Sequence, residues 1–160
     1  MKSIVVYFSL EGNTKLIAET IAKELDADVM ELKTKKYFSK GKFKKIFLGG
    51  KSVIFKEYPK LTNKYIDLNG YDNIFLGILI WVGTYASPFN IFIREYNLYN
   101  KNIGLFACNG GGSSKKCFDA FKMTFKHNNF IGEIDFIDPL RGNAEECILK
   151  TKEWVKSLKI

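Results

Sequence analysis

The sequence predicts an α/β fold in which a doubly wound, five-stranded parallel sheet is covered by helices on both faces. Short apolar runs alternate with segments of helical periodicity, in the order βαβαβαβαβα. Three of the five predicted strands are apolar on both faces, as strands buried between two helix layers are. The 160 residues suffice for one compact core. We therefore expect a single domain over residues 1–160.

The first predicted strand covers residues 2–8 and ends at Ser9. A helix follows over residues 14–25, where apolar side chains recur at spacings of three and four. The next strand, residues 28–32, alternates polar and apolar residues, which is typical of a sheet edge. A lysine-rich stretch comes next, and its apolar residues predict a short amphipathic helix within residues 43–54.

The remaining strands are predicted over residues 71–80, 102–108 and 130–138. The first two are apolar throughout and, like the strand at residues 2–8, should be central in the sheet. The last one carries Glu133 and Asp135, so it should be the second edge.

Capping residues mark the starts of the remaining helices. Ser87 before Pro88 predicts a helix to about residue 96, and Ser113 or Ser114 predicts the start of the next one. Asn143, followed by Ala-Glu-Glu, resembles a capping box and predicts a last helix through residue 158.

The turn after the first strand has the composition of an anion site. It contains Ser9, Glu11, Gly12, Asn13 and Thr14. Backbone N–H groups at a helix start carry partial positive charge, and the glycine lets the backbone close around a ligand. The two hydroxyls and the amide can donate hydrogen bonds to phosphate oxygens. The alternative is an ordinary turn with Asn13 as N-cap, since neither a Walker nor a dinucleotide glycine pattern occurs.

Ser9-x-x-Gly12-Asn13-Thr14 directly after a first strand resembles the phosphate loop of the flavodoxin family. The resemblance extends over nearly the whole chain and implies a flavodoxin-like sheet of order 2-1-3-4-5, numbered along the chain. That order agrees with the central and edge strands assigned above. The resemblance also implies that FMN is the cofactor and that this loop holds its phosphate, with Glu11 contributing only its backbone.

Two further loops leave strand ends that this sheet order places side by side. The resemblance implies that the second loop, Ile80, Trp81, Val82, Gly83 and Thr84, walls the flavin ring, and that the third, Cys108, Asn109, Gly110 and Gly111, borders its polar edge. Two alternatives stay open: Trp81 packs in the core, or Cys108 is a small buried apolar residue. The first and third strands end at Phe8-Ser9 and Ile80-Trp81, where a phosphate-receiver site needs carboxylates, so such a site is excluded.

The second and third loops are free of acidic residues, from residue 81 to 88 and from 108 to 116. Nearby carboxylates would disfavour an anionic flavin. From the loop sequences alone, we expect a second-electron potential less negative than that of an acidic flavodoxin.

Positive charge is concentrated between Lys33 and Lys64. This segment has eleven lysines and one acidic residue, Glu57, whereas the rest of the chain is slightly acidic. Compositional bias alone can produce such a run. The functional alternative is a docking surface for an acidic redox partner. Nucleic acid is disfavoured, because the segment lacks arginine and its phenylalanines are better explained as anchors to the sheet.

Other features bear on location. No apolar run is long enough to span a bilayer, and the chain starts directly with a strand, so we expect neither a signal peptide nor membrane association. The three cysteines form no metal-binding or CxxC spacing, which favours reduced thiols and a cytoplasmic location.

The sequence thus predicts an FMN-binding electron carrier that shuttles electrons between redox protein partners. Such a protein needs no catalytic acid or base, because the flavin ring carries the chemistry. One alternative is an NAD(P)H-dependent FMN or quinone reductase on the same scaffold, although no pyridine-nucleotide motif is present. Another is a flavin-free interaction module built on the basic segment.

Overall fold

The computed structural model describes residues 1–34, 60–81 and 83–160, apart from the side chain of Trp81. The short helix predicted within residues 43–54 lies outside the described residues, as does most of the lysine-rich segment.

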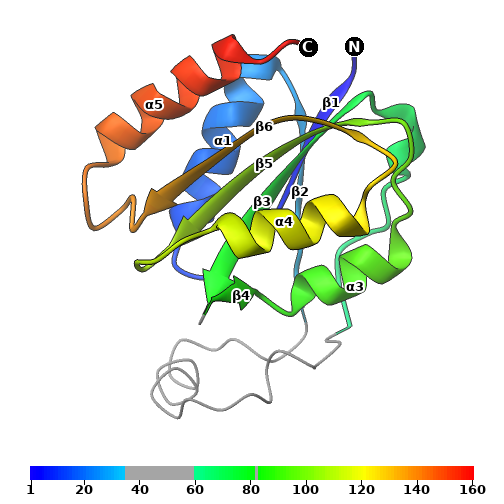
Figure 1. Cartoon of the computed structure of the whole chain (residues 1–160), viewed down its shortest axis with the longest axis horizontal. Coiled ribbons are helices and arrows are strands. Elements are labelled where there is room, and N and C mark those ends of the chain that lie inside the picture. The colour runs from blue at the N-terminus through cyan, green and yellow to red at the C-terminus, as the bar shows by residue number, and fades with distance from the viewer. Residues whose placement is uncertain (35–59, 82) are drawn as a thin grey trace.

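Five parallel strands form the central sheet, in the order β2-β1-β3-β5-β6 (Figure 1). They are β1 (Ser3–Tyr7), β2 (Asp28–Glu31), β3 (Asn73–Trp81), β5 (Asn102–Asn109) and β6 (Asn129–Ile137). Every residue of β1 is buried, whereas β2 and β6 each have a single buried residue, the others being half-buried or exposed. The predicted fold class, strand order and edge strands are therefore confirmed.

A sixth, very short strand was missed by the sequence analysis. β4 (Thr84–Tyr85) turns back antiparallel on the end of β3, pairing Ile80 with Tyr85 and Trp81 with Thr84. The sequence analysis predicted only a loop here, because a strand of two residues leaves no periodic signal. Backbone pairing between β3 and β4 therefore fixes the two ends of the second loop.

Of the helices in the described ranges, two cover each face of the sheet (Figure 1). α1 (Asn13–Leu25) and α5 (Ala144–Ser157) share a core with the side chains on one face. α3 (Pro88–Glu95) and α4 (Lys115–Thr124) cover the other face, and a short 3₁₀ turn, η2 (Leu68–Gly70), precedes β3. This arrangement follows from the apolar stripe of each helix, which must be buried against the sheet.

Aromatic side chains join α3 to α4. Phe89 meets Phe121 edge to face, with ring centroids 5.3 Å apart, and Phe121 meets Tyr85 of β4 in the same way at 5.1 Å. Edge-to-face contacts of this kind stabilise aromatic pairs beyond their buried area. The β4 hairpin is therefore packed against the helical layer next to it.

The predicted helix starts are close to the observed ones. Asn143 caps α5 by accepting a hydrogen bond from the Glu146 N–H, at 3.1 Å. Ser114 stands at the N-cap of α4, but its hydroxyl makes no capping bond. Asn13 is the first residue of α1 rather than its cap, since Gly12 holds the N-cap position.

A row of side-chain amides crosses the amino edge of the sheet. Asn73 donates to Ser3 Oγ at 3.1 Å, Asn102 donates to Asn73 Oδ1 at 2.9 Å, and Asn129 donates to Asn102 Oδ1 at 3.0 Å. These residues are directly paired across four strands. Each inner amide therefore both donates and accepts a hydrogen bond. These bonds offset the free-energy cost of burying the polar side chain of Asn73.

We expect Asn73→Ala to lower the free energy of unfolding by about 2 kcal/mol, because it removes two hydrogen bonds and leaves the buried Ser3 hydroxyl without its donor. Urea denaturation measures this. Asn129→Ala, at the exposed end of the same row, is the matched control and should cost less than about 0.5 kcal/mol. Equal losses for the two variants would contradict this account of the row.

Candidate functional site

The three predicted site loops lie together at the carboxyl edge of the sheet. They follow β1, β3 and β5, which are direct neighbours in the strand order. Hydrogen bonds also anchor two of these loops to neighbouring elements: the Phe8 N–H donates to the Gly77 carbonyl of β3 at 3.2 Å, and the Cys117 thiol of α4 reaches the Gly83 carbonyl at 3.9 Å. This edge is where ligands bind in open parallel sheets.

The first loop is shaped by Ser9 and Gly12. The Gly12 N–H donates to Ser9 Oγ at 3.2 Å, so the serine hydroxyl keeps its own hydrogen free for another acceptor. Gly12 has φ +99°, a conformation that residues with a Cβ avoid. No side chain caps α1, which leaves N–H groups of its first turn available to a ligand or to water.

Thr14 carries a polar atom that this part of the structure leaves unsatisfied. Its side chain is fully buried, and Oγ1 has no hydrogen-bond partner among the described residues. The nearby Cys108 is a poor partner: burial raises the pKa of its thiol to about 12, a shift that the Thr14 hydroxyl only partly opposes. A buried hydroxyl without a partner is costly, so its presence at the helix start points to an absent acceptor.

Asn13 is engaged elsewhere in the fold. Its Oδ1 accepts from the Leu140 N–H at 2.8 Å, and its Nδ2 donates to Asp138 Oδ1 at 3.3 Å. The Asn13 side chain therefore holds the loop between β6 and α5, and this contact uses one of the two Nδ2 hydrogens.

The second loop is only partly described. Ile80 is buried in the core on the α3–α4 side, while Gly83 is exposed with φ +78° and Thr84 is half-buried. Val82 and the side chain of Trp81 lie outside the described residues. The predicted aromatic wall therefore stays a prediction.

The third loop is fixed by a network of polar side chains. Buried Asn109 accepts from the Gly111 N–H at 2.9 Å and donates to Ser114 Oγ at 3.2 Å. Ser114 in turn donates to Asp135 Oδ2 on the edge strand β6, at 2.7 Å. Asn109 and Ser114 thus shape the loop, while Gly110 and Gly111 are exposed.

Two carboxylates flank this loop although its own sequence has none. Asp135 is bonded to Ser114, and a Cβ placed on Gly110 would lie 3.9 Å from Asp138 Oδ2. Both acids come from β6 and the residue after it, because β5 and β6 are paired side by side. The expectation of weak repulsion counted only acids close in sequence and was therefore incomplete.

The predicted site residues divide into a surface set and a supporting set. The exposed or half-buried residues are Ser9, Glu11, Gly12, Gly83, Thr84, Gly110 and Gly111. The buried ones are Asn13, Thr14, Ile80, Cys108 and Asn109. Cys108 lies inside the core shared with α1 and α5, which agrees with the alternative that it is a small buried apolar residue.

Sequence reasoning missed four residues that contact these loops: Ser114 as a member of the third-loop network, Asp135, Asp138 and Arg141. Three of them lie on or after β6, whose carboxyl end shares the edge with the three loops. The predicted strand order already placed the end of this strand beside the third loop, so these residues could have been found from the sequence.

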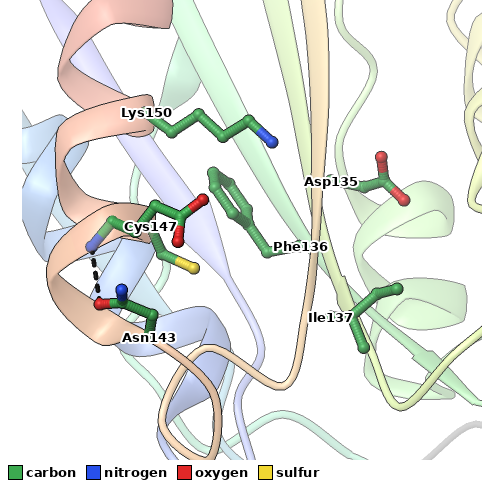
Figure 2. Close-up of a pocket in the computed structure, with 7 residues that line it drawn as sticks. Asp135, Phe136, Ile137, Asn143, Cys147 and Lys150 are labelled. Atoms are coloured by element: carbon green, nitrogen blue, oxygen red, sulfur yellow. Dashed lines mark hydrogen bonds between the residues drawn. The ribbon is translucent and has the colours of Figure 1, made fainter.

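A separate hollow of about 330 Å³ lies between β6 and α5, and Figure 2 shows the side chains around it. It is lined by Asp135, Phe136, Ile137, Asn143, Glu146, Cys147 and Lys150. None of the residues predicted for the three loops lines it. Within the described part of the chain, no group of His, Cys, Asp and Glu side chains could hold a metal ion.

Comparison with known proteins agrees with this geometry. A family model described as flavodoxin matches residues 2–156. The chain belongs to the flavodoxin family. Among curated proteins, it is 33% identical over 110 residues to the flavodoxin-like domain-containing protein BilS of Clostridioides difficile (strain CD3), which covers 69% of this chain. The chain spans about half of that relative's length, 48%.

Solved structures resemble this flavodoxin-family chain over nearly its full length. A putative flavoprotein from Bacteroides uniformis ATCC 8492 superposes with a TM-score of 0.75 at 24% identity, covering 98% of each chain. A flavoprotein from Lactobacillus acidophilus NCFM in complex with FMN gives a TM-score of 0.66 at 26% identity, covering 88% of this chain and 96% of that one. Of the helices described for the present chain, none has the length and apolarity to cross a membrane.

We expect Ser114→Ala to lower the free energy of unfolding by about 1.5 kcal/mol, because a hydroxyl bonded to a carboxylate is lost from a buried network. The Gly111 amide should also exchange its hydrogen faster, since Asn109 loses one of its anchors. Urea denaturation and amide hydrogen exchange measure the two effects. Ser113→Ala is the control at an exposed neighbour. It loses only an exposed bond from the Lys115 N–H at 3.2 Å, so it should cost less than about 0.5 kcal/mol and leave the Gly111 exchange unchanged. A Ser114→Ala protein as stable as the control would refute the role of the network.

Proposed function

We propose that this chain is an FMN-binding protein that carries electrons between redox partners. FMN is the cofactor of this chain, and its phosphate binds in the loop after β1. The observation that carries the proposal is the buried, unpartnered hydroxyl of Thr14 at the uncapped start of α1. The family of the chain and the FMN complex of the Lactobacillus relative support the same cofactor.

The donors of the first loop fit a phosphate group. Ser9 has a hydroxyl hydrogen that no described residue accepts, α1 offers N–H groups at its positive end, and Gly12 has no side chain of its own to cover them. Thr14 Oγ1 would gain the acceptor that the protein itself does not supply.

The other two loops would hold the ring. Gly110 and Gly111 present backbone without side chains at the end of β5, and the bond from Gly111 to Asn109 fixes that backbone. The second loop carries Gly83 and Thr84 next to the end of β3, where Thr84 pairs with Trp81. When bound, FMN would supply one- and two-electron chemistry; the protein's task is to hold it and to set the polarity around it.

The lysine-rich segment is proposed as the docking surface for an acidic redox protein. Its support is the charge of the sequence between Lys33 and Lys64. Electron transfer to an acidic partner should then slow as salt is raised from 0.05 to about 0.5 M, because ions screen the attraction. A salt-independent rate in a stopped-flow experiment would remove this partner assignment and leave FMN binding untouched.

Titration of the apoprotein with FMN tests the cofactor assignment. Flavin fluorescence should be quenched at micromolar concentrations, and the purified holoprotein should be yellow. Rapid oxidation of NADH or NADPH by the holoprotein would identify it as a reductase instead of a carrier. An apoprotein that leaves the fluorescence of FMN unchanged would overturn the proposal.

We expect Thr14→Val to have opposite effects on stability and on binding. It should raise the stability of the apoprotein by about 1 kcal/mol, because it removes an unsatisfied buried hydroxyl without changing shape, and weaken FMN binding about tenfold. Urea denaturation and fluorescence titration measure the two. Thr20→Val is the matched control in the same helix; its hydroxyl already donates to the Leu16 carbonyl at 2.8 Å, so FMN affinity should stay unchanged.

A further inference from the structure

Residues 138–141, in the loop between β6 and α5, contact consecutive residues of the first loop. Asn13 binds Asp138 and the Leu140 backbone, as described above. A Cβ on Gly12 would lie only 3.1 Å from Leu140 Cδ1, so Leu140 sits directly over the glycine. Glu11 lies near Arg141, so three consecutive residues, 11–13, contact residues 138–141.

Glu11 poses an electrostatic problem for an anion site. It stands between Ser9 and Gly12, and its side chain is 54% exposed. A phosphate monoester carries a charge of roughly −1.5 to −2 at neutral pH. A carboxylate in the same short loop repels such a ligand, since the opposing charges of the loop are only partial ones from backbone N–H groups.

Arg141 offsets this repulsion. Its guanidinium Nη2 lies 3.7 Å from Glu11 Oε2. Arginine stays protonated at every physiological pH, so the pair is neutral whenever it is formed. Arg141 is held in reach of Glu11 because Leu140, the preceding residue, is bonded through its N–H to Asn13.

We propose that the loop between β6 and α5 is a fourth part of the phosphate site, in which Arg141 acts as a positioning and charge-neutralising residue that makes the Glu11-containing loop able to accept a phosphorylated flavin. This inference rests on the proposed function. Arg141 neutralises the charge of Glu11, while Asn13 and Leu140 hold the two loops in register. The consequence is selectivity: Arg141 favours the phosphorylated flavin over the same flavin without phosphate.

The test compares FMN with riboflavin, which lacks the phosphate. Arg141→Gln, Glu11→Gln and the double variant are titrated with both flavins at 0.05 M salt, and thermal unfolding is followed for each. Arg141→Gln should weaken FMN about three- to fivefold, the range for a partly exposed charge interaction, and leave riboflavin within about twofold. Glu11→Gln/Arg141→Gln should recover the wild-type FMN affinity, since no unpaired carboxylate remains.

Lys152→Gln is the matched control. It breaks an ion pair elsewhere, between Lys152 of α5 and Glu24 near the far end of α1, at 3.0 Å. It should leave the ratio of FMN to riboflavin affinity unchanged. Raising the salt to about 1 M should shrink the Arg141→Gln effect on FMN, because exposed charges are then screened.

Several results would overturn the inference. Equal losses for FMN and riboflavin would show that Arg141 merely supports the fold. A double variant as weak as Arg141→Gln would show that the guanidinium binds the phosphate itself. Wild-type affinity for FMN in Arg141→Gln would remove the neutralising role alone, whereas a wild-type protein that binds neither flavin would remove the proposed function as well.

Discussion

Parallel pairing of β1 with β3, and of β3 with β5, is the constraint on which the candidate site depends. Since parallel strands all end at one edge, the loops after Tyr7, Trp81 and Asn109 are brought together although they are far apart in sequence. The apolar composition of these three strands enforces the pairing, because each must be covered by helices on both faces. The position of the three loops is therefore set by the strands and not by the composition of the loops.

The two edges of the sheet treat polar groups in opposite ways. At the amino edge, the side chains of Ser3, Asn73, Asn102 and Asn129 satisfy one another. At the carboxyl edge, Asn109 and Ser114 are satisfied too, but Thr14 is not. The open hydroxyl at the carboxyl edge is the group whose hydrogen bond the proposed phosphate would complete.

Sequence reasoning reached the fold and the three loops because both rest on local signals. Apolar period, capping residues and the Ser9–Thr14 turn can be read within a few residues of each other. The fourth loop could not be found this way, because Asn13 and Asp138 are 125 residues apart. The same limit affected the electrostatics: the third loop has no acid of its own, yet Asp135 bonds to Ser114 across the paired strands. β4 was missed for another reason, since two residues carry no period.

Ser114 and Thr14 affect stability and binding differently. Loss of the Ser114 hydroxyl would remove a bond that the protein already makes, so folding and site shape would suffer together. Loss of the Thr14 hydroxyl would remove a bond that only a ligand completes, so folding would gain what binding loses. A ligand that binds the folded chain and completes this bond must also stabilise the fold by mass action. The unsatisfied oxygen at the start of α1 is thus a cost of the free protein that bound phosphate would remove, which links cofactor affinity to the stability of the helix that carries it.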